Sequence, residues 1–298
     1  MFLSVMMAVF SGLFFALSSL GYKMGERRRC RAQAFLFVFA ASGGVVAGVK
    51  AIFETTQWVE PRLWLLGSAM GIFLNLAIFF VLQANRFGPA FMSWTVLNLS
   101  LLLPVILSPF LFGERFYWLD PMITIFFILM LWFFAKGMPN GSMKKKERGM
   151  VHILMLVALF FANGFLQLGN KYKYILFGDL NTSGLLFILY LSGGLVALMV
   201  ICAQGSSPLI SSAEFRVGGV TGLLNGIGAI FYVGAMNLPA SVVFPVSAGI
   251  GLIGGVFLTI FIFEERMDRF KAMGLAFGFM ALALAIMREP LAKHLNPF

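Results

Sequence analysis

The chain alternates between long apolar stretches and short polar links. Ten apolar stretches are long enough, or nearly so, to cross about 30 Å of hydrocarbon as a helix. They cover residues 1–22, 32–53, 63–84, 89–112, 117–136, 149–170, 182–203, 217–236, 240–263 and 271–288. This pattern predicts an all-α integral membrane protein with ten transmembrane helices.

The longest polar link, residues 137–148 (GMPNGSMKKKER), separates five stretches from the next five. The sequence therefore predicts two units, residues 1–136 and 149–288, joined by a basic loop. An odd number of spans in each unit gives the two units opposite orientations in the membrane. We therefore expect a pair of inverted five-helix repeats.

Short motifs recur between the two units at a nearly constant spacing of about 150 residues, as expected for an internal repeat. The recurring motifs are Leu74-Asn75 with Leu224-Asn225, Pro89-Ala90 with Pro239-Ala240, Glu114-Arg115 with Glu265-Arg266, and Gly21-Tyr22-Lys23 with Gly169-Asn170-Lys171. A stripe of glycines at Gly218, Gly222 and Gly226 predicts a close approach between two helices.

Composition places the chain in lipid. It is 60% hydrophobic and 11% charged, against roughly 45–50% and about 25% in soluble domains. The net charge of +10 does not indicate nucleic acid, because 15 of the 22 Lys and Arg residues lie on one side of the predicted membrane. The positive-inside rule places that side, with Lys144, Lys145 and Lys146, in the cytoplasm and both termini outside. We expect the plasma membrane, in a bacterium the inner membrane.

These features resemble the drug/metabolite transporter superfamily, and within it the ten-helix EamA-like transporters. The resemblance rests on a helix ending in Gly21-Tyr22-Lys23, a fourth stretch from Pro89-Ala90 to Glu114-Arg115, and a ninth from Pro239-Ala240 to Glu264-Glu265-Arg266. It implies a central cavity between inverted repeats and transport by alternating access. Many members place the amino terminus in the cytoplasm, opposite to the orientation that the charges predict.

Polar side chains inside the stretches are the candidates for contact with a substrate. Asn163, Gln167 and Lys171 recur every four residues and share one helical face. The predicted substrate-binding residues are Asn75, Trp94, Asn98, Asn163, Gln167, Asn225 and Tyr232. As repeat mates, Asn75 and Asn225 form a predicted symmetric pair. The alternative is that these groups only bond neighbouring helices, at about 0.6 kcal/mol each.

Charged groups near the helix ends allow two interpretations. Lys23 and Lys171 are repeat mates that would attract an anionic group at opposite mouths of the cavity, or would reach toward lipid headgroups. Glu114 and Glu265 are expected to pair with the neighbouring Arg115 and Arg266 and to fix the turns.

The sequence has neither a cluster of catalytic side chains at membrane depth nor a phosphate-binding Gly-Lys-Ser/Thr loop. We therefore predict no enzyme, no cofactor and no metal. The expected partners are a small polar metabolite and membrane lipid, with the chain acting as a monomer or a homodimer. The alternative is a membrane sensor or scaffold subunit that transports nothing.

Overall fold

The structure, a computed structural model, describes residues 2–54, 58, 60–87, 90–114, 117–136, 146–204, 210–263 and 269–295. Every regular element in these ranges is a helix. The helices are α1 (Phe2–Arg27), α2 (Ala32–Phe53), α3 (Pro61–Phe87), α4 (Ala90–Leu99), α5 (Leu102–Phe112), α6 (Leu119–Lys136), α7 (Lys146–Phe177), α8 (Thr182–Ala203), α9 (Ser212–Gly234), α10 (Ala240–Phe263) and α11 (Arg269–Leu295).

Each of the ten predicted stretches falls on a helix, and the stretch 89–112 falls on two, α4 and α5. Among the described residues, six helices are long and apolar enough to cross a membrane: α1, α2, α3, α7, α8 and α9. Four shorter apolar segments lie at Val96–Phe112, Leu119–Phe133, Ala240–Gly255 and Ala272–Ala285. The basic loop lies outside the described residues, except for its last residues, which begin α7.

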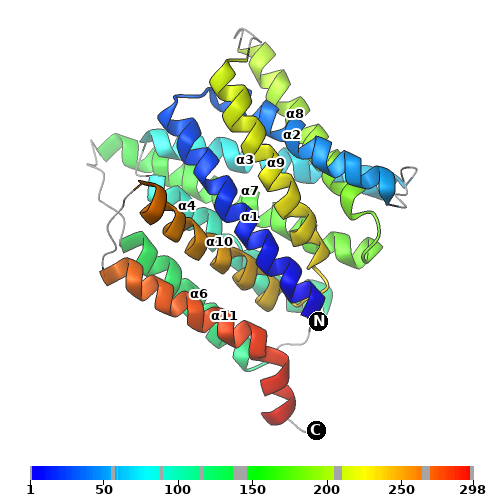
Figure 1. Ribbon diagram of the computed structural model, residues 1–298, viewed down its shortest axis with the longest axis vertical. Coiled ribbons are helices and arrows are strands. Elements are labelled where there is room, and N and C mark those ends of the chain that lie inside the picture. The colour runs from blue at the N-terminus through cyan, green and yellow to red at the C-terminus, as the bar shows by residue number, and fades with distance from the viewer. Residues whose placement is uncertain are drawn as a thin grey trace.

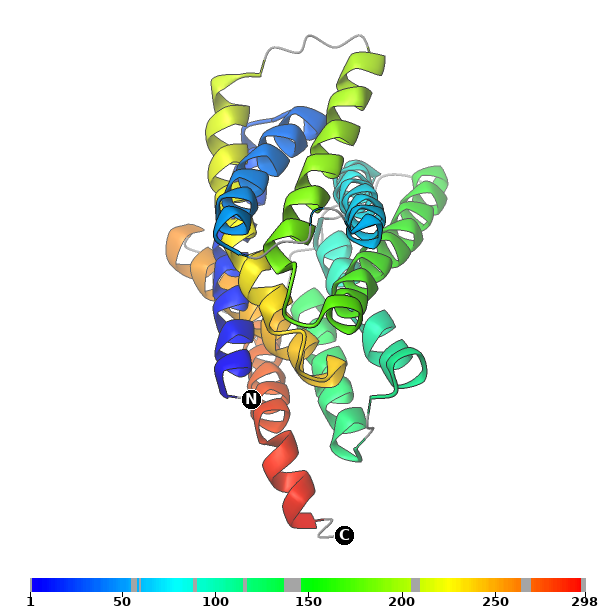
Figure 2. The same ribbon diagram turned by 90° about the vertical axis from the view of Figure 1, so that its right-hand side faces the viewer.

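The helices form an elongated bundle (Figures 1 and 2). The pair α2 and α8 lies at one end of the long axis, and the pair α6 and α11 lies at the other. Between them, α1 packs against α9 and α10, and α7 packs against α3, α4 and α5. Helices far apart in the sequence are therefore neighbours throughout the bundle.

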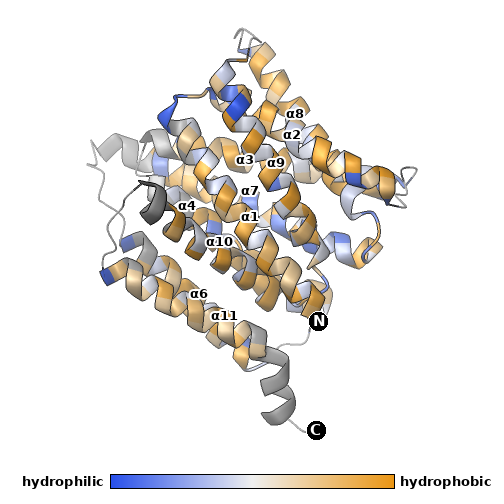
Figure 3. Ribbon diagram, in the orientation of Figure 1, coloured by the Kyte–Doolittle hydropathy of each residue, from blue (hydrophilic) through white to orange (hydrophobic). Residues whose placement is uncertain are grey.

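The outer surface of the bundle is apolar. Most of each helix is coloured as hydrophobic in Figure 3. Large side chains point outward, such as Phe110, which is 84% exposed, and Phe215, which is 66% exposed. A soluble protein does not expose apolar surface on this scale, so the solvent around these helices is lipid.

Glycine contacts recur between the two halves. A Cβ atom on Gly67 of α3 would lie 2.8 Å from Ile188 and 3.3 Å from the carbonyl oxygen of Leu185 on α8. A Cβ atom on Gly218 of α9 would lie 3.2 Å from Val38 and 3.1 Å from the carbonyl oxygen of Phe35 on α2. The two contacts are equivalent, with α8 displaced from α2 by 150 residues and α9 displaced from α3 by 151.

The glycine stripe on α9 makes the predicted close approach. Gly218 lies against Phe35, and a Cβ on Gly226 would lie 3.0 Å from the Cα atom of Gly43 on α2. Farther along the bundle, Gly21 of α1 contacts Thr221 of α9, and Gly169 of α7 contacts Met70 of α3. The spacing between Met70 and Thr221 is again 151, so the same displacement relates neighbouring turns of α3 and α9.

The break between α4 and α5 departs from the predicted continuous stretch, and Pro104 explains it. Proline has no N–H to donate to the carbonyl four residues earlier, which here belongs to Ser100. The nitrogen of Leu103 bonds that carbonyl instead, at 3.0 Å, and the nitrogen of Leu101 bonds Asn98 at 3.2 Å. The carbonyl of Leu97 thereby loses its ordinary helical partner.

Candidate functional site

The polar face of α7 crosses the bundle interior, and its residues contact two other helices and a turn. Asn163 meets the break between α4 and α5, Gln167 meets α9, and Lys171 meets the turn between α9 and α10. The shared face that the sequence predicts for these three residues therefore faces other helices rather than lipid.

Asn163 supplies the hydrogen bonds that the broken helix lacks. Its side-chain nitrogen donates to the freed carbonyl of Leu97 at 3.0 Å and to the Ser100 hydroxyl at 2.7 Å. The Ser100 hydroxyl also donates to Leu97, at 2.6 Å. Asn163 is 6% exposed, so these bonds lie inside the protein. The amide therefore holds α7 against the bend of α4 and α5.

Gln167 is the centre of a second group. Its side-chain oxygen accepts a hydrogen bond from the Tyr232 hydroxyl at 2.9 Å and one from the Asn170 side chain at 3.0 Å. The ring of Tyr232 packs edge-on against Phe15 and Phe244. The sequence predicted Gln167 and Tyr232 as partners of one substrate, and the structure joins them directly. Asn170 was matched in the repeat but not predicted as a site residue.

Lys171 is buried in an ion pair. Its ammonium donates to the carbonyl oxygens of Met236 at 3.0 Å and Leu238 at 2.6 Å, and it pairs with Glu114. The other oxygen of Glu114 accepts the backbone N–H of Ala240 at 2.9 Å. The sequence placed Lys171 at a helix end, but α7 continues to Phe177 and carries the side chain inside the protein. Its three N–H donors are satisfied there, which leaves none for a headgroup or an anion.

Glu114 therefore pairs across the bundle with Lys171. The expected pairing with Arg115, and that of Glu265 with Arg266, involve residues that lie outside those described. The side chains of Lys23 and Trp94 also lie outside the described part, although their helices, α1 and α4, are described. Asn98 is partly buried on α4, where its backbone carbonyl accepts the N–H of Leu101.

Asn75 and Asn225 make contacts of different kinds. The side-chain nitrogen of Asn75 donates to the carbonyl of Gly193 on α8 at 3.2 Å. The side-chain oxygen of Asn225 accepts the hydroxyl of Tyr190 on α8 at 2.8 Å. Since α9 is displaced from α3 by 151 residues, Gly226 is the structural counterpart of Asn75. The two asparagines match in sequence but stand one residue out of register in space.

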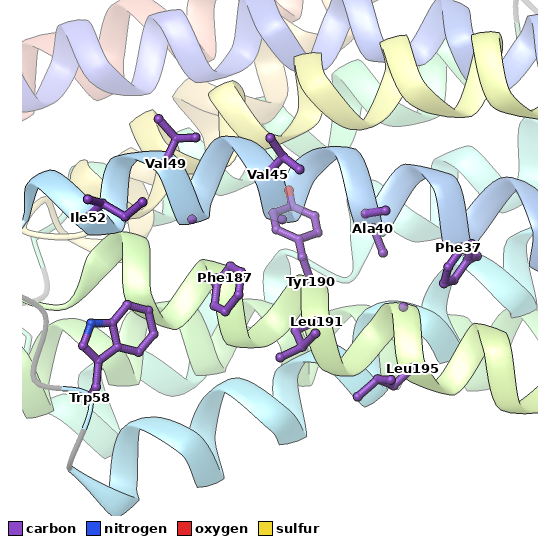
Figure 4. A pocket seen from close by; sticks show the side chains of 14 residues that line it. Phe37, Ala40, Val45, Val49, Ile52, Trp58, Phe187, Tyr190, Leu191 and Leu195 are labelled. Atoms are coloured by element: carbon purple, nitrogen blue, oxygen red, sulfur yellow. The ribbon is translucent and has the colours of Figure 1, made fainter.

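A groove with a volume of about 550 Å³ lies between α2 and α8 (Figure 4). Trp58 stands at one end of it, Phe37 and Leu195 at the other, and Tyr190 crosses the middle. None of the predicted substrate-binding residues lines this groove, and its lining is almost wholly apolar. It is therefore a hollow in the lipid-facing surface, separate from the polar contacts of α7.

The described part of the chain has no cluster of side chains that could hold a metal ion. No three His, Cys, Asp or Glu side chains come together there as ligands. The polar groups that do come together are amides, hydroxyls and one ion pair. Such groups bind and orient an uncharged polar molecule through hydrogen bonds.

Comparison with known proteins identifies the fold but no family. No protein-family model matches the chain, and no curated protein matches it. A solved structure described only as "Crystal structure of protein" has a similar fold, with a TM-score of 0.77 and 14% sequence identity. The match covers 96% of this chain and 98% of that chain. The long apolar helices and the exposed apolar side chains show that the chain is a helical, multi-pass integral membrane protein.

Proposed function

We propose that the chain is a secondary transporter that moves a small polar metabolite by alternating access between two inverted five-helix repeats, in the manner of the EamA-like transporters it resembles. The recurrence of equivalent glycine contacts carries this proposal, because a displacement of 150 residues for α2 and α8 and of 151 for α3 and α9 is what paired halves require. The exchange of partners, α1 with α9 and α7 with α3, supports the same symmetry.

The polar groups of α7 support a substrate path between the halves. Asn163 reaches from the second half to the break between α4 and α5 in the first half, Gln167 bonds α9 within the second half, and the ion pair of Lys171 with Glu114 links the two halves directly. Charged residues inside a membrane protein are costly and mark functional pathways. A scaffold subunit does not need this number of buried polar groups at its centre.

The direct test is flux. Purified protein is screened for thermal stabilisation by amino acids, nucleosides, sugars and phosphorylated metabolites, and each stabilising compound is then tested for uptake into proteoliposomes. The proposal expects saturable uptake that needs the protein in the membrane. Stabilising compounds that never cross the membrane would instead favour a sensor.

Gln167 gives the matched test of the site. Gln167→Ala removes a hydrogen-bonding group and should weaken apparent substrate affinity several-fold, from the roughly 0.5–1.5 kcal/mol that one such bond contributes. Phe165→Ala, on the opposite and exposed face of α7, is the control and should leave affinity unchanged. Lower thermal stability with unchanged affinity for Gln167→Ala would assign Gln167 to helix packing alone.

A further inference from the structure

The side-chain oxygen of Asn170 is buried and has no hydrogen-bond partner in the described part of the chain. Asn170 is only 6% exposed, and its side-chain nitrogen already donates to Gln167. A buried carbonyl oxygen without a partner loses its hydration and gains nothing in return, so such groups are rare in native proteins and call for an explanation.

A free donor lies beside this free acceptor. The oxygen of Gln167 accepts from both Tyr232 and Asn170, and the side-chain nitrogen of Gln167 makes no hydrogen bond within the part of the chain that is described. Gln167 is partly exposed, so this nitrogen is accessible to a small molecule. The two amides thus share one hydrogen bond and leave one NH2 group, that of Gln167, and one carbonyl oxygen, that of Asn170, without a partner among the described residues.

This conclusion holds for either orientation of the amide groups. If both amides are rotated by 180°, the nitrogen of Gln167 donates to Tyr232 and Asn170, and the free groups become the nitrogen of Asn170 and the oxygen of Gln167. One donor and one acceptor remain in both cases. A ligand with a donor and an acceptor side by side satisfies both.

The neighbouring ion pair determines the charge of that ligand. Lys171 follows Asn170 directly, and its ammonium donates to Met236, Leu238 and Glu114. The ion pair is neutral as a unit, and an anion would have to break it. The unused hydrogen-bonding capacity therefore belongs to the uncharged amides.

We propose that Gln167 and Asn170 bind the polar edge of an uncharged substrate that carries an N–H donor beside a carbonyl acceptor, as amides and imides do. This inference rests on the proposed transport function and narrows its substrate class. It also adds Asn170 to the site as a residue that touches the substrate.

The test combines the isosteric apolar variant Asn170→Leu with matched probes. The probes are nicotinamide and uracil, their donor-free forms N,N-dimethylnicotinamide and 1,3-dimethyluracil, and the anion nicotinate. In the wild type, at least one of nicotinamide and uracil should raise the melting temperature at millimolar concentration, and the donor-free forms and nicotinate should not.

Asn170→Leu should abolish that stabilisation or weaken the apparent Kd about tenfold, as expected for the loss of one or two hydrogen bonds. Without a probe, the variant should melt about 2 °C higher than the wild type, because a buried unpaired oxygen has been removed. Gln33→Met is the control, since the Gln33 side chain also has a buried oxygen without a partner, on α2. It should raise the melting temperature similarly and leave the response to the probes intact.

Three results overturn the inference. The first is a lower melting temperature for Asn170→Leu with an unchanged probe response, which would mean that Asn170 only packs or holds a trapped water. The second is equal stabilisation by the donor-free forms or by nicotinate, and the third is no stabilisation by either nicotinamide or uracil.

Uptake measurements distinguish this inference from the proposed function. Binding without uptake into proteoliposomes would reject transport but not the ligand class. Uptake that is unaffected by Asn170→Leu would reject the inference but not transport.

Discussion

Helices α1 and α7 occupy matching places in the sequence repeat, but at equivalent positions α1 has apolar side chains and α7 has a polar amide. α1 packs through small and aromatic groups: Ala16 lies against Gly254, and Phe15 lies edge-on to Tyr232. At the positions 148 residues later, α7 has Gly164 against Leu103 and the amide of Asn163 at the break in α4 and α5.

The difference follows from the helix that each one faces. α10 continues unbroken from Ala240 to Phe263, although Pro245, in its second turn, removes one backbone hydrogen bond. The stretch 89–112 has Pro104 in its middle and breaks there. Where α10 is continuous, at Gly251 and Gly254, α1 presents the side chains of Phe15 and Ala16. A broken helix needs a donor, and Asn163 provides it.

The largest expected effect concerns the ion pair at the end of this polar face. Lys171→Met leaves the Glu114 carboxylate without its charged partner and frees the carbonyls of Met236 and Leu238. Loss of one partner from a buried pair costs about 3–5 kcal/mol. Reversible unfolding in mixed micelles measures this loss.

Lys50→Met is the matched control for the ion pair. Lys50 pairs with Glu54 at 2.7 Å, but its side chain is 45% exposed. An exposed pair contributes at most about 1 kcal/mol. Equal losses for the two variants would show that Lys171 is not held in the buried arrangement.

The second prediction concerns Asn163 itself. Asn163→Leu removes the hydrogen bonds to the Leu97 carbonyl and the Ser100 hydroxyl, and the loss of stability should be about 1–3 kcal/mol, at roughly 0.5–1.5 kcal/mol for each of the two bonds, because the Ser100 hydroxyl still donates to Leu97. Val157→Leu places the same side chain at an exposed position of α7 and should change stability by no more than about 0.5 kcal/mol. A loss for Asn163→Leu as small as that of the control would break the contrast between α1 and α7.

The third prediction tests whether Pro104 is the cause of the need for Asn163. Pro104→Ala restores the missing N–H, so Leu101 can return to its ordinary bond with Leu97. In that background the cost of Asn163→Leu should fall by about 1 kcal/mol, a coupling within the range seen for residues that share a network. Additive effects in the double variant would mean that the break persists without the proline.

The sequence predicted the helices and their close contacts because those depend on local pattern. Apolar length located every stretch, and the spacing of Gly218, Gly222 and Gly226 predicted a close helix contact, which the structure places against α2. The partners of the polar groups depend on the tertiary arrangement instead.

Two examples show why the partners could not be read from the pattern. The bond between Asn163 and Leu97 lies at a break in another part of the chain, close to Pro104. Asn75 and Asn225 are 150 residues apart, but α9 is displaced from α3 by 151 residues, so the two asparagines do not occupy equivalent positions. The matching sequence motifs, at a spacing of 150, do not reveal this shift of one residue.

The smallest expected effect compares two tyrosine hydroxyls that each donate to an amide oxygen. Tyr232→Phe removes the bond to Gln167, but Asn170 still donates to the same oxygen. Tyr190→Phe removes the hydrogen bond to the side-chain oxygen of Asn225. One neutral hydrogen bond contributes roughly 0.5–1.5 kcal/mol, and we expect Tyr232→Phe at the lower end and Tyr190→Phe at the upper end. The free energy of unfolding of the two variants, measured side by side, decides the order. The reverse order would show that Asn170 does not compensate for the lost hydroxyl, and that Gln167 depends on α9 rather than on its own helix.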